Sequence, residues 1–392
     1  MSKTEIPSIR FRGFDDAWEQ RKVGEVSESY SGGTPSVGVK EYYGGQIPFI
    51  RSAEINSEIT ELFLTEEGLK NSSARLVAVG DILYALYGAT SGEVGRARLK
   101  GAINQAILVI KPHTDYDSEY LAQWLRKSKH SIIETYLQGG QGNLSGTIVK
   151  ELSVDFPSLK EQKAIGDFFR HLDNLITLHQ RKFEKLTNVK KSMLEKMFPQ
   201  NGSCYPAVRF KEFTDPWEQR KFEEIAVRSS VICSDDTLPR VEYEDIVSGT
   251  GRLNKDIYAK QSSKSGIAFH QGDVLYGKLR PYLQNWLLPT FDGLAVGDFW
   301  VLQPQNADSS FLYRLIQSRQ FDEVANQSTG TKMPRADWKL VSKTVFSIPS
   351  NISEQAAIGT YFTALDSLIT LHQRELEKLQ SIKKALLEKM FV

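Results

Sequence analysis

Basic, amide and aromatic side chains gather in glycine-containing stretches at two corresponding places in the chain. The first stretch, Tyr87–Arg98, reads YGATSGEVGRAR, and the second, Tyr276–Tyr282, reads YGKLRPY. Arginine and lysine can donate hydrogen bonds to guanine edges or phosphates, and amide side chains can pair with adenine. The chemistry that these residue types favour is therefore the binding of DNA. The residues that we expect to contact DNA are Arg51, Tyr87, Arg96, Arg98, Asn104, Gln105, Gln141, Asn143, Lys278, Arg280, Tyr282, Lys332 and Arg335. Taken singly, each is more often an ordinary surface residue, so the prediction depends on their clustering.

Patterns that would indicate catalysis are missing from the sequence. It contains no [DN]PP[YF] adenine-methylation motif, no glycine-rich methyl-donor site, no Walker A sequence and no convincing nuclease cluster of carboxylates. The only cysteines, Cys204 and Cys233, form no CxxC pair, so we expect neither a disulfide framework nor a zinc site. We therefore predict no catalytic residue, no metal and no cofactor in this chain, which is not an enzyme by itself.

The elements that would carry the DNA-contacting loops occur twice. Phe11–Lys22, FRGFDDAWEQRK, returns as Phe210–Lys221, FKEFTDPWEQRK. Glu161–Phe198 returns as Glu354–Phe391 with about two-thirds of its positions identical, including the run LITLHQR. The sequences between these repeats differ. Two similar frames with different contents indicate one scaffold that presents two recognition surfaces.

The longer repeat predicts two coiled-coil helices. Apolar residues follow one another at steps of three and four, and the pattern assigns Leu175 and Leu368 to the seam between the helices. Each helix would be about 55 Å long. The seam positions that we expect to contact the partner helix are Leu172, His179, Leu186, Leu365, His372 and Leu379. The two histidines are read as a polar pair that fixes the register, because a metal site would need more ligands nearby.

The connections predict that the helices are antiparallel. The first helix ends near Pro199, and the second variable region begins almost at once. We therefore expect an α+β protein in which two similar target-recognition domains are joined by two long antiparallel coiled-coil helices, as a pseudo-twofold dumbbell. The expected segments are domain 1 at residues 1–158, helix 1 at 159–199, domain 2 at 200–350 and helix 2 at 351–392.

Composition limits the function without fixing it. The formal net charge of +1 argues against a protein that coats DNA without specificity. It leaves room for a protein that reads a short sequence with few side chains while a partner supplies phosphate contacts. The opening MSKTEIPSIRF has no signal-peptide core, and no stretch approaches the ~18 apolar residues of a membrane helix. We expect a cytoplasmic protein with no membrane partner.

Four features together carry a family resemblance. They are the repeated opening segment at 11–22 and 210–221, the stretch from Gly32-Gly33-Thr34-Pro35-Ser36 to Ile50, the repeated Pro-Ser…Glu-Gln…Ala-Ile pattern at 157–165 and 349–358, and the alternation of variable domain and repeated helix. The whole chain resembles the DNA-specificity subunits of type I restriction–modification systems. One feature departs from the pattern, because domain 2 has Ser229–Cys233, SSVIC, where domain 1 has GGTPS.

The resemblance implies a mechanism. Each domain would read one half of a split, asymmetric sequence in double-stranded DNA. The helices would set the unread spacer and dock two modification subunits, which flip and methylate adenine. Restriction subunits would add translocation and cleavage. The cofactors S-adenosylmethionine, ATP and Mg²⁺ would belong to those partner subunits. Two alternatives are a coiled-coil assembly scaffold without DNA specificity and a self-sufficient DNA methyltransferase or nuclease.

Overall fold

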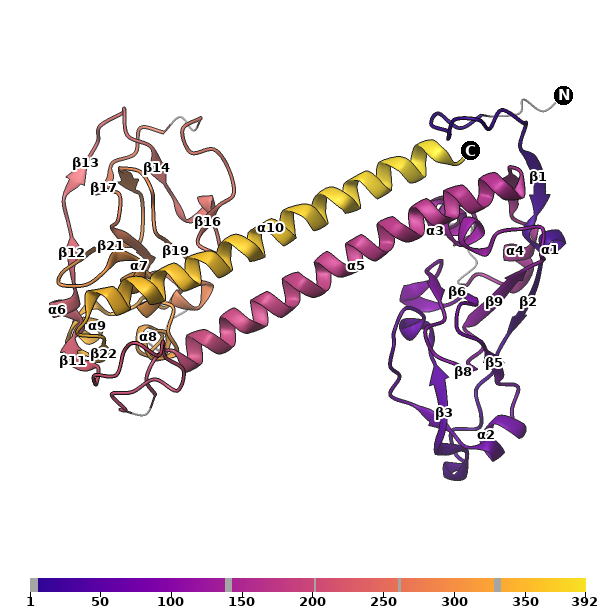
Figure 1. Cartoon of the computed structure of the whole chain (residues 1–392), viewed down its shortest axis with the longest axis horizontal. Coiled ribbons are helices and arrows are strands. Elements are labelled where there is room, and N and C mark those ends of the chain that lie inside the picture. Colours follow the sequence, from indigo (N-terminus) through magenta and orange to yellow (C-terminus); the bar gives the residue numbers. More distant parts are fainter. Residues whose placement is uncertain (1–5, 138–142, 201, 260–261, 328–332) are drawn as a thin grey trace. The chain divides into compact units, whose positions relative to one another are not determined.

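The computed structural model describes residues 6–137, 143–200, 202–259, 262–327 and 333–392, and it divides into two units (Figure 1). Unit 1 is Met1–His179 with Glu375–Val392, and unit 2 is Gln180–Arg374. Two long helices, α5 (Leu159–Lys196) and α10 (Ile352–Met390), each contribute one half to each unit. The fold class expected from the sequence, α+β domains with two long helices, is confirmed.

Unit 1 contains two four-stranded sheets. The first has the order β2-β9-β6-β7 and is antiparallel throughout, whereas the second, β4-β3-β8-β5, includes one parallel pair, β3 with β8. A separate antiparallel pair joins β1 to β10. The strands are β1 (Glu19–Lys22), β2 (Ser27–Ser31), β3 (Tyr43–Ile50), β4 (Phe63–Leu64), β5 (Arg75–Val77), β6 (Ile82–Ala85), β7 (Val94–Arg96), β8 (Gly101–Ile103), β9 (Ile107–Pro112) and β10 (Ser153–Phe156). The helices besides α5 and α10 are α1 (Val23–Val26), α2 (Glu66–Lys70), α3 (Ser118–Leu137) and α4 (Gly146–Glu151).

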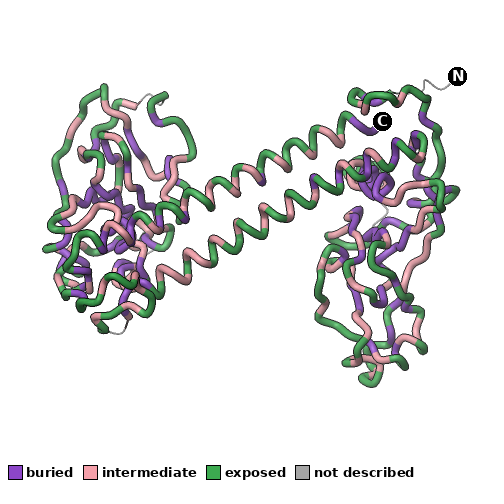
Figure 2. Tube along the Cα trace, viewed as in Figure 1, coloured by how far each residue is buried: buried purple, intermediate pink, exposed green. Residues whose placement is uncertain are grey.

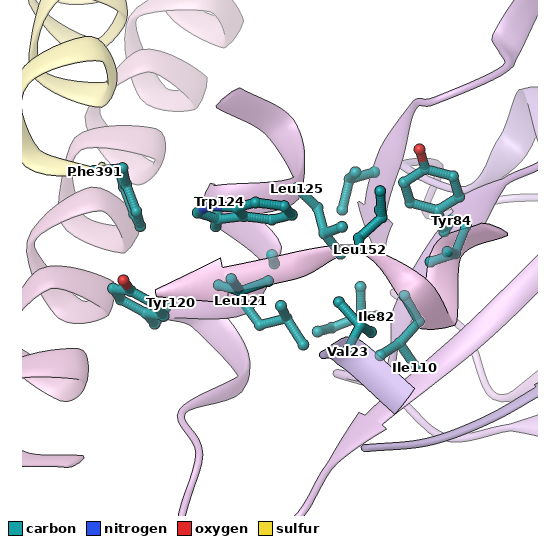
Figure 3. Close-up of a cluster of buried hydrophobic side chains, with 14 of the residues drawn as sticks. Val23, Ile82, Tyr84, Ile110, Tyr120, Leu121, Trp124, Leu125, Leu152 and Phe391 are labelled. Carbon is teal, nitrogen blue, oxygen red and sulfur yellow. The ribbon is translucent and has the colours of Figure 1, made fainter. Parts of the chain in front are cut away.

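The apolar run of β9 is buried on both faces because side chains alternate along a strand. Leu108 and Ile110 enter the core between the first sheet and the helices. Ile107 and Val109 enter the core that the first sheet forms with the second sheet. Figure 3 shows the first of these cores, where Ile110 lies near Ile82 of β6 and Val23 of α1, while Phe391 lies at the other end of the cluster near Tyr120 of α3. A strand that must fill two cores is therefore apolar at successive positions rather than at alternate ones.

Unit 2 repeats this frame. Its first sheet has the order β12-β21-β18-β19, its second β13-β17-β20-β14 again contains one parallel pair, and β11 pairs with β22 as β1 does with β10. The strands are β11 (Glu218–Lys221), β12 (Ala226–Ser229), β13 (Ile232–Cys233), β14 (Arg240–Val241), β15 (Ile246–Val247), β16 (Arg252–Leu253), β17 (Gly266–Phe269), β18 (Val274–Gly277), β19 (Trp286–Leu287), β20 (Gly293–Ala295), β21 (Phe299–Pro304) and β22 (Val345–Ile348). The remaining helices are α6 (Phe222–Ile225), α7 (Ser309–Leu315), α8 (Arg319–Ala325) and α9 (Trp338–Lys343).

The arginine just before each copy of the repeated opening segment is bound to the start of a long helix. Arg10 Nε donates to the buried carboxylate of Glu161 at 2.6 Å, and Arg209 Nε donates to Glu354 at 2.7 Å. A buried carboxylate needs such a partner, because an unpaired charge away from water is costly. The arginine and the glutamate are far apart in the sequence, and their contact explains why both recur in the second unit.

The C-terminal ends of α10 and α5 make matching contacts with the segment that precedes each domain. In unit 1 the backbone N–H of Ile9 donates to the carbonyl of Lys389 at 3.0 Å, and in unit 2 that of Val208 donates to Lys196 at 3.0 Å. The ring of Phe391 packs against Tyr120. In each unit the end of one long helix therefore reaches the domain from which the other long helix begins, which makes the two helices antiparallel.

The seam between the long helices differs from the sequence expectation at two leucines. Leu175 and Leu368, which the apolar pattern assigns to the seam, are 46% and 44% exposed. Phe169 and Ile176 pack into the core of unit 1 instead, at the same spacing of three and four but one residue further along. The buried residues of α5 lie in its first turns beside the domain (Figure 2).

Candidate DNA-binding surfaces

Most of the basic residues expected to contact DNA are paired with carboxylates of the same domain. In domain 1, Arg51 Nη2 lies 2.6 Å from Glu54 and 2.9 Å from Glu61, and Arg98 Nη1 lies 2.7 Å from Glu58. The Glu61 and Glu58 side chains are exposed, so exchange of these partners for a phosphate costs little, because exposed ion pairs contribute at most about 1 kcal/mol. The Glu54 side chain is only 13% exposed and holds Arg51 more firmly. Arg98 is therefore more available to DNA than Arg51, and neither is a dedicated DNA contact on this geometry.

Arg96 is held more firmly than the sequence suggests. Its Nε donates to Glu119 at 3.1 Å, its Nη1 to the carbonyl of Gly80 at 2.8 Å, and its Nη2 to the hydroxyl of Ser118 at 2.9 Å. All three nitrogen atoms thus have acceptors inside the domain, and Glu119 is buried. These contacts favour a structural role for Arg96, joining β7 to the start of α3, over contact with a base.

The amide and aromatic candidates of domain 1 that the structure describes lie in half-buried or exposed positions. Asn104 Oδ1 accepts from the backbone N–H of Ala106 at 3.2 Å, and Gln105 accepts from the hydroxyl of Thr34 at 2.6 Å. Tyr87 is exposed before the short turn at Gly88–Thr90. Asn143 is exposed, and Gln141 lies outside the described residues.

The corresponding turn of domain 2 connects β18 to β19. Lys278 Nζ lies 3.5 Å from Asp298, and Arg335 Nη2 lies 3.1 Å from the same carboxylate. Burial opposes ionisation of Asp298, but the hydrogen bond from Arg335 and the two nearby positive charges outweigh it, so the pKa of Asp298 is lowered. Tyr282 projects from this turn and is exposed. Lys332 lies outside the described residues.

Arg280, in the same turn, differs from the other basic candidates. No acceptor for its guanidinium is present among the residues that the structure describes, and its Nε is buried. Every other basic candidate in the described ranges has a carboxylate partner. Sequence reasoning grouped Arg280 with its neighbours, because the carboxylates that pair with them come from distant parts of the chain.

The long helices form a second candidate surface. Leu172 and Leu379 pack with the core of unit 1, and Leu186 and Leu365 pack with the core of unit 2. Their contact with the partner helix stays a prediction. His179 and His372 are half-buried. Within the described ranges no cluster of histidine, cysteine, aspartate or glutamate could hold a metal ion, and no described helix is long and apolar enough to span a bilayer.

The repeated run LITLHQR leaves leucines in solvent in both units. Leu175 and Leu178 of α5 are exposed, and so are Leu368 and Leu371 of α10. Exposed apolar side chains at neighbouring positions of a helix often mark a surface that another protein covers. The sequence offered a signal for this surface, because residues 175 and 178 do not both fit a seam that runs through Leu172 and Ile176.

Comparison with known proteins decides the family. The family described as type I restriction modification DNA specificity domain matches residues 15–188 and 217–381, which is most of the chain. The chain belongs to this family. Catalysis in such systems belongs to partner subunits, and this chain is a DNA-sequence specificity subunit of a multisubunit complex.

The specificity subunit is similar over nearly its full length to several relatives. The MjaVIII specificity subunit of Methanocaldococcus jannaschii is 22% identical, over 94% of this chain and 91% of its own. The EcoDI specificity subunit of Escherichia coli is 23% identical, over 95% and 88%. A crystal structure of a type I S subunit from M. genitalium has the same fold, with a TM-score of 0.67 and 15% identity over 99% of both chains.

Proposed function

We propose that the two domains of this specificity subunit each read one half of a split, asymmetric sequence in double-stranded DNA. The observation that carries the proposal is a shared frame with different loops. The first sheets have the same strand order and matching antiparallel partners in both units, whereas the turn after β6 contains Gly88 and the turn after β18 contains Arg280. Two copies of one frame with unlike side chains are suited to reading two unlike half-sites.

The partners of this subunit would be modification subunits, two copies of them, together with restriction subunits. The repeated leucines support the number two, because Leu175 and Leu178 in one unit have the counterparts Leu368 and Leu371 in the other. Each set presents the same residues to solvent, so one kind of partner could bind twice. S-adenosylmethionine, ATP and Mg²⁺ would be bound by those partners, and the complex would act on DNA in the cytoplasm.

Adenine methylation in such a complex requires a division of labour. The atom that is methylated lies within the base stack, so the modification subunit must flip the base out of the duplex. The specificity subunit would place that subunit at the correct base by holding the half-sites on either side. Its own contribution is binding and positioning, and no catalytic step involves its side chains.

Co-expression with a cognate modification subunit tests this proposal. DNA from the host should carry methyladenine at one bipartite motif, and the purified chain with S-adenosylmethionine but without the modification subunit should methylate nothing. Methylation by the chain alone, or a continuous rather than split motif, would contradict the proposal. A sample of the modification subunit without this chain is the matched control.

A further inference from the structure

The turns after β6 and β18 both have positive φ at two corresponding positions, but with different residues. In domain 1, Gly88 has φ 75° and Gly92 has φ 79°. In domain 2, Arg280 has φ 49° and Gln284 has φ 55°. The two pairs are separated by the same number of residues as the repeated segments Gly80–Tyr84 and Gly272–Tyr276. Domain 2 therefore places long side chains where domain 1 has glycine.

These positions favour glycine for a steric reason. A positive φ brings the Cβ of an L-residue close to the following carbonyl, and glycine has no Cβ. In the part of the chain that the structure describes, Asn306 is the one further non-glycine residue with positive φ, and asparagine tolerates this conformation. Arginine does not share that tolerance. A strained residue of this kind is found where its side chain has a use.

The two long side chains differ in their contacts. Gln284 hydrogen-bonds to Asp322 of α8, so its amide has a partner within the domain. Arg280 has a buried Nε and no acceptor among the described residues. A partly buried guanidinium without an acceptor can bind a ligand that supplies a hydrogen-bond acceptor. An arginine side chain can donate two parallel hydrogen bonds to O6 and N7, the two acceptors on the major-groove edge of guanine.

The backbone of the turn holds Arg280 in place. Its N–H donates to the carbonyl of Pro334 at 2.7 Å, and the N–H of Leu279 donates to the Tyr243 hydroxyl at 2.8 Å. Pro281 follows directly and restricts the next φ. The exposed ring of Tyr282 follows two residues after Arg280. A side chain on a rigid turn loses little freedom on binding, which suits a residue that discriminates between bases.

We propose that Arg280 is a specificity-determining residue that reads a guanine edge in the half-site of domain 2. This inference rests on the proposed function, in which domain 2 reads one half-site. Domain 1 has no equivalent contact, because Gly88 occupies the matching position. Among the residues that the structure describes, the other basic candidates of domain 2 are Lys278 and Arg335, which share Asp298 and act at most as phosphate contacts.

Two substitutions that accept the left-handed backbone test the inference without endangering the fold. Arg280→Gly gives domain 2 the residue of domain 1, and Arg280→Asn keeps a polar side chain. The assembled methyltransferase is assayed on duplexes in which each base pair of the motif is changed in turn. Both variants should lose discrimination at one guanine position of one half-site, by roughly 5- to 150-fold. Their melting temperatures should equal or exceed that of the unchanged chain.

The control is Arg319→Ala, which removes an exposed arginine from α8 of the same unit. It should leave the methylated motif unchanged. Equal loss of rate on every duplex would make Arg280 a phosphate contact and overturn the inference, as would full discrimination in Arg280→Gly. A lowered melting temperature in both variants would assign Arg280 a structural role instead. If the unchanged complex gave no bipartite motif, the proposed function would fail, whereas a bipartite motif insensitive to Arg280 would remove this inference alone.

Discussion

Asp173 of α5 forms an ion pair with Lys383 of α10, in which Oδ1 and Nζ are 2.5 Å apart. This contact has a counterpart in the other unit. There Lys190 of α5 lies 2.6 Å from Asp366 of α10. Moving forward on α5 from 173 to 190 corresponds to moving backward on α10 from 383 to 366 by the same number of residues. Both pairs therefore fit one antiparallel register.

Replacing Asp366 should lower the free energy of unfolding more than replacing Asp173. Asp366 also accepts from Arg314, whose side chain is 3% exposed, whereas Asp173 accepts from Arg126, which is 22% exposed. Asp366→Asn would leave a buried guanidinium without its charge partner and should lower the free energy of unfolding by about 3 kcal/mol. Asp173→Asn should cost about 1 kcal/mol. Chemical denaturation measures both, with the exposed Glu184→Gln as control, and equal costs would contradict the burial argument.

Arg96→Ala distinguishes a structural arginine from a DNA contact. The substitution removes three hydrogen bonds that Arg96 donates, one of them to the buried Glu119. It should therefore destabilise unit 1 by about 1–3 kcal/mol. The methylated motif should be unchanged in the folded protein. Relaxed specificity at a single base pair, with normal stability, would instead identify Arg96 as a base contact.

The exposed leucines should matter for assembly but not for folding. Replacing Leu175 and Leu178 together by alanine should change stability by less than about 1 kcal/mol, because both side chains already face solvent. Binding of the modification subunit should weaken. Leu172→Ala is the matched contrast, since this buried leucine should cost about 2–5 kcal/mol. Unchanged affinity in a titration with the modification subunit would show that the partner binds elsewhere.

Lengthening the helices tests whether they set the DNA spacer. One heptad added near Lys185 of α5 and one near Lys378 of α10 keeps the seam and both aspartate–lysine pairs in register. Each helix grows by about 10 Å, and one base pair occupies ~3.4 Å of duplex, so the unread spacer should lengthen by a few base pairs. The half-sites themselves should stay the same. Full activity with an unchanged spacer, read by methylation mapping, would leave the helices as a docking surface only.

The sequence allowed the frame to be predicted better than the details of the surfaces. Repeats and apolar periodicity were sufficient for the long helices, but the apolar pattern over 310–326 does not show that this stretch forms two helices, α7 and α8. The Ser318 hydroxyl accepts from the N–H of Phe321 at 3.3 Å and begins a new helix, a local signal that the apolar pattern obscured. The partners of Arg98 and Arg96 could not be predicted, because Glu58 and Glu119 come from other parts of the chain.

The central claim, that each domain reads its own half-site, is tested most directly by exchanging one domain. Residues 205–349 are replaced by the corresponding segment of a relative with a different motif, and both long helices are kept. Methylation mapping of a host that carries the chimera with the modification subunit should show one half of the motif replaced by the relative's half, while the other half is preserved. A motif in which both halves change, or neither does, would contradict independent reading by the two domains.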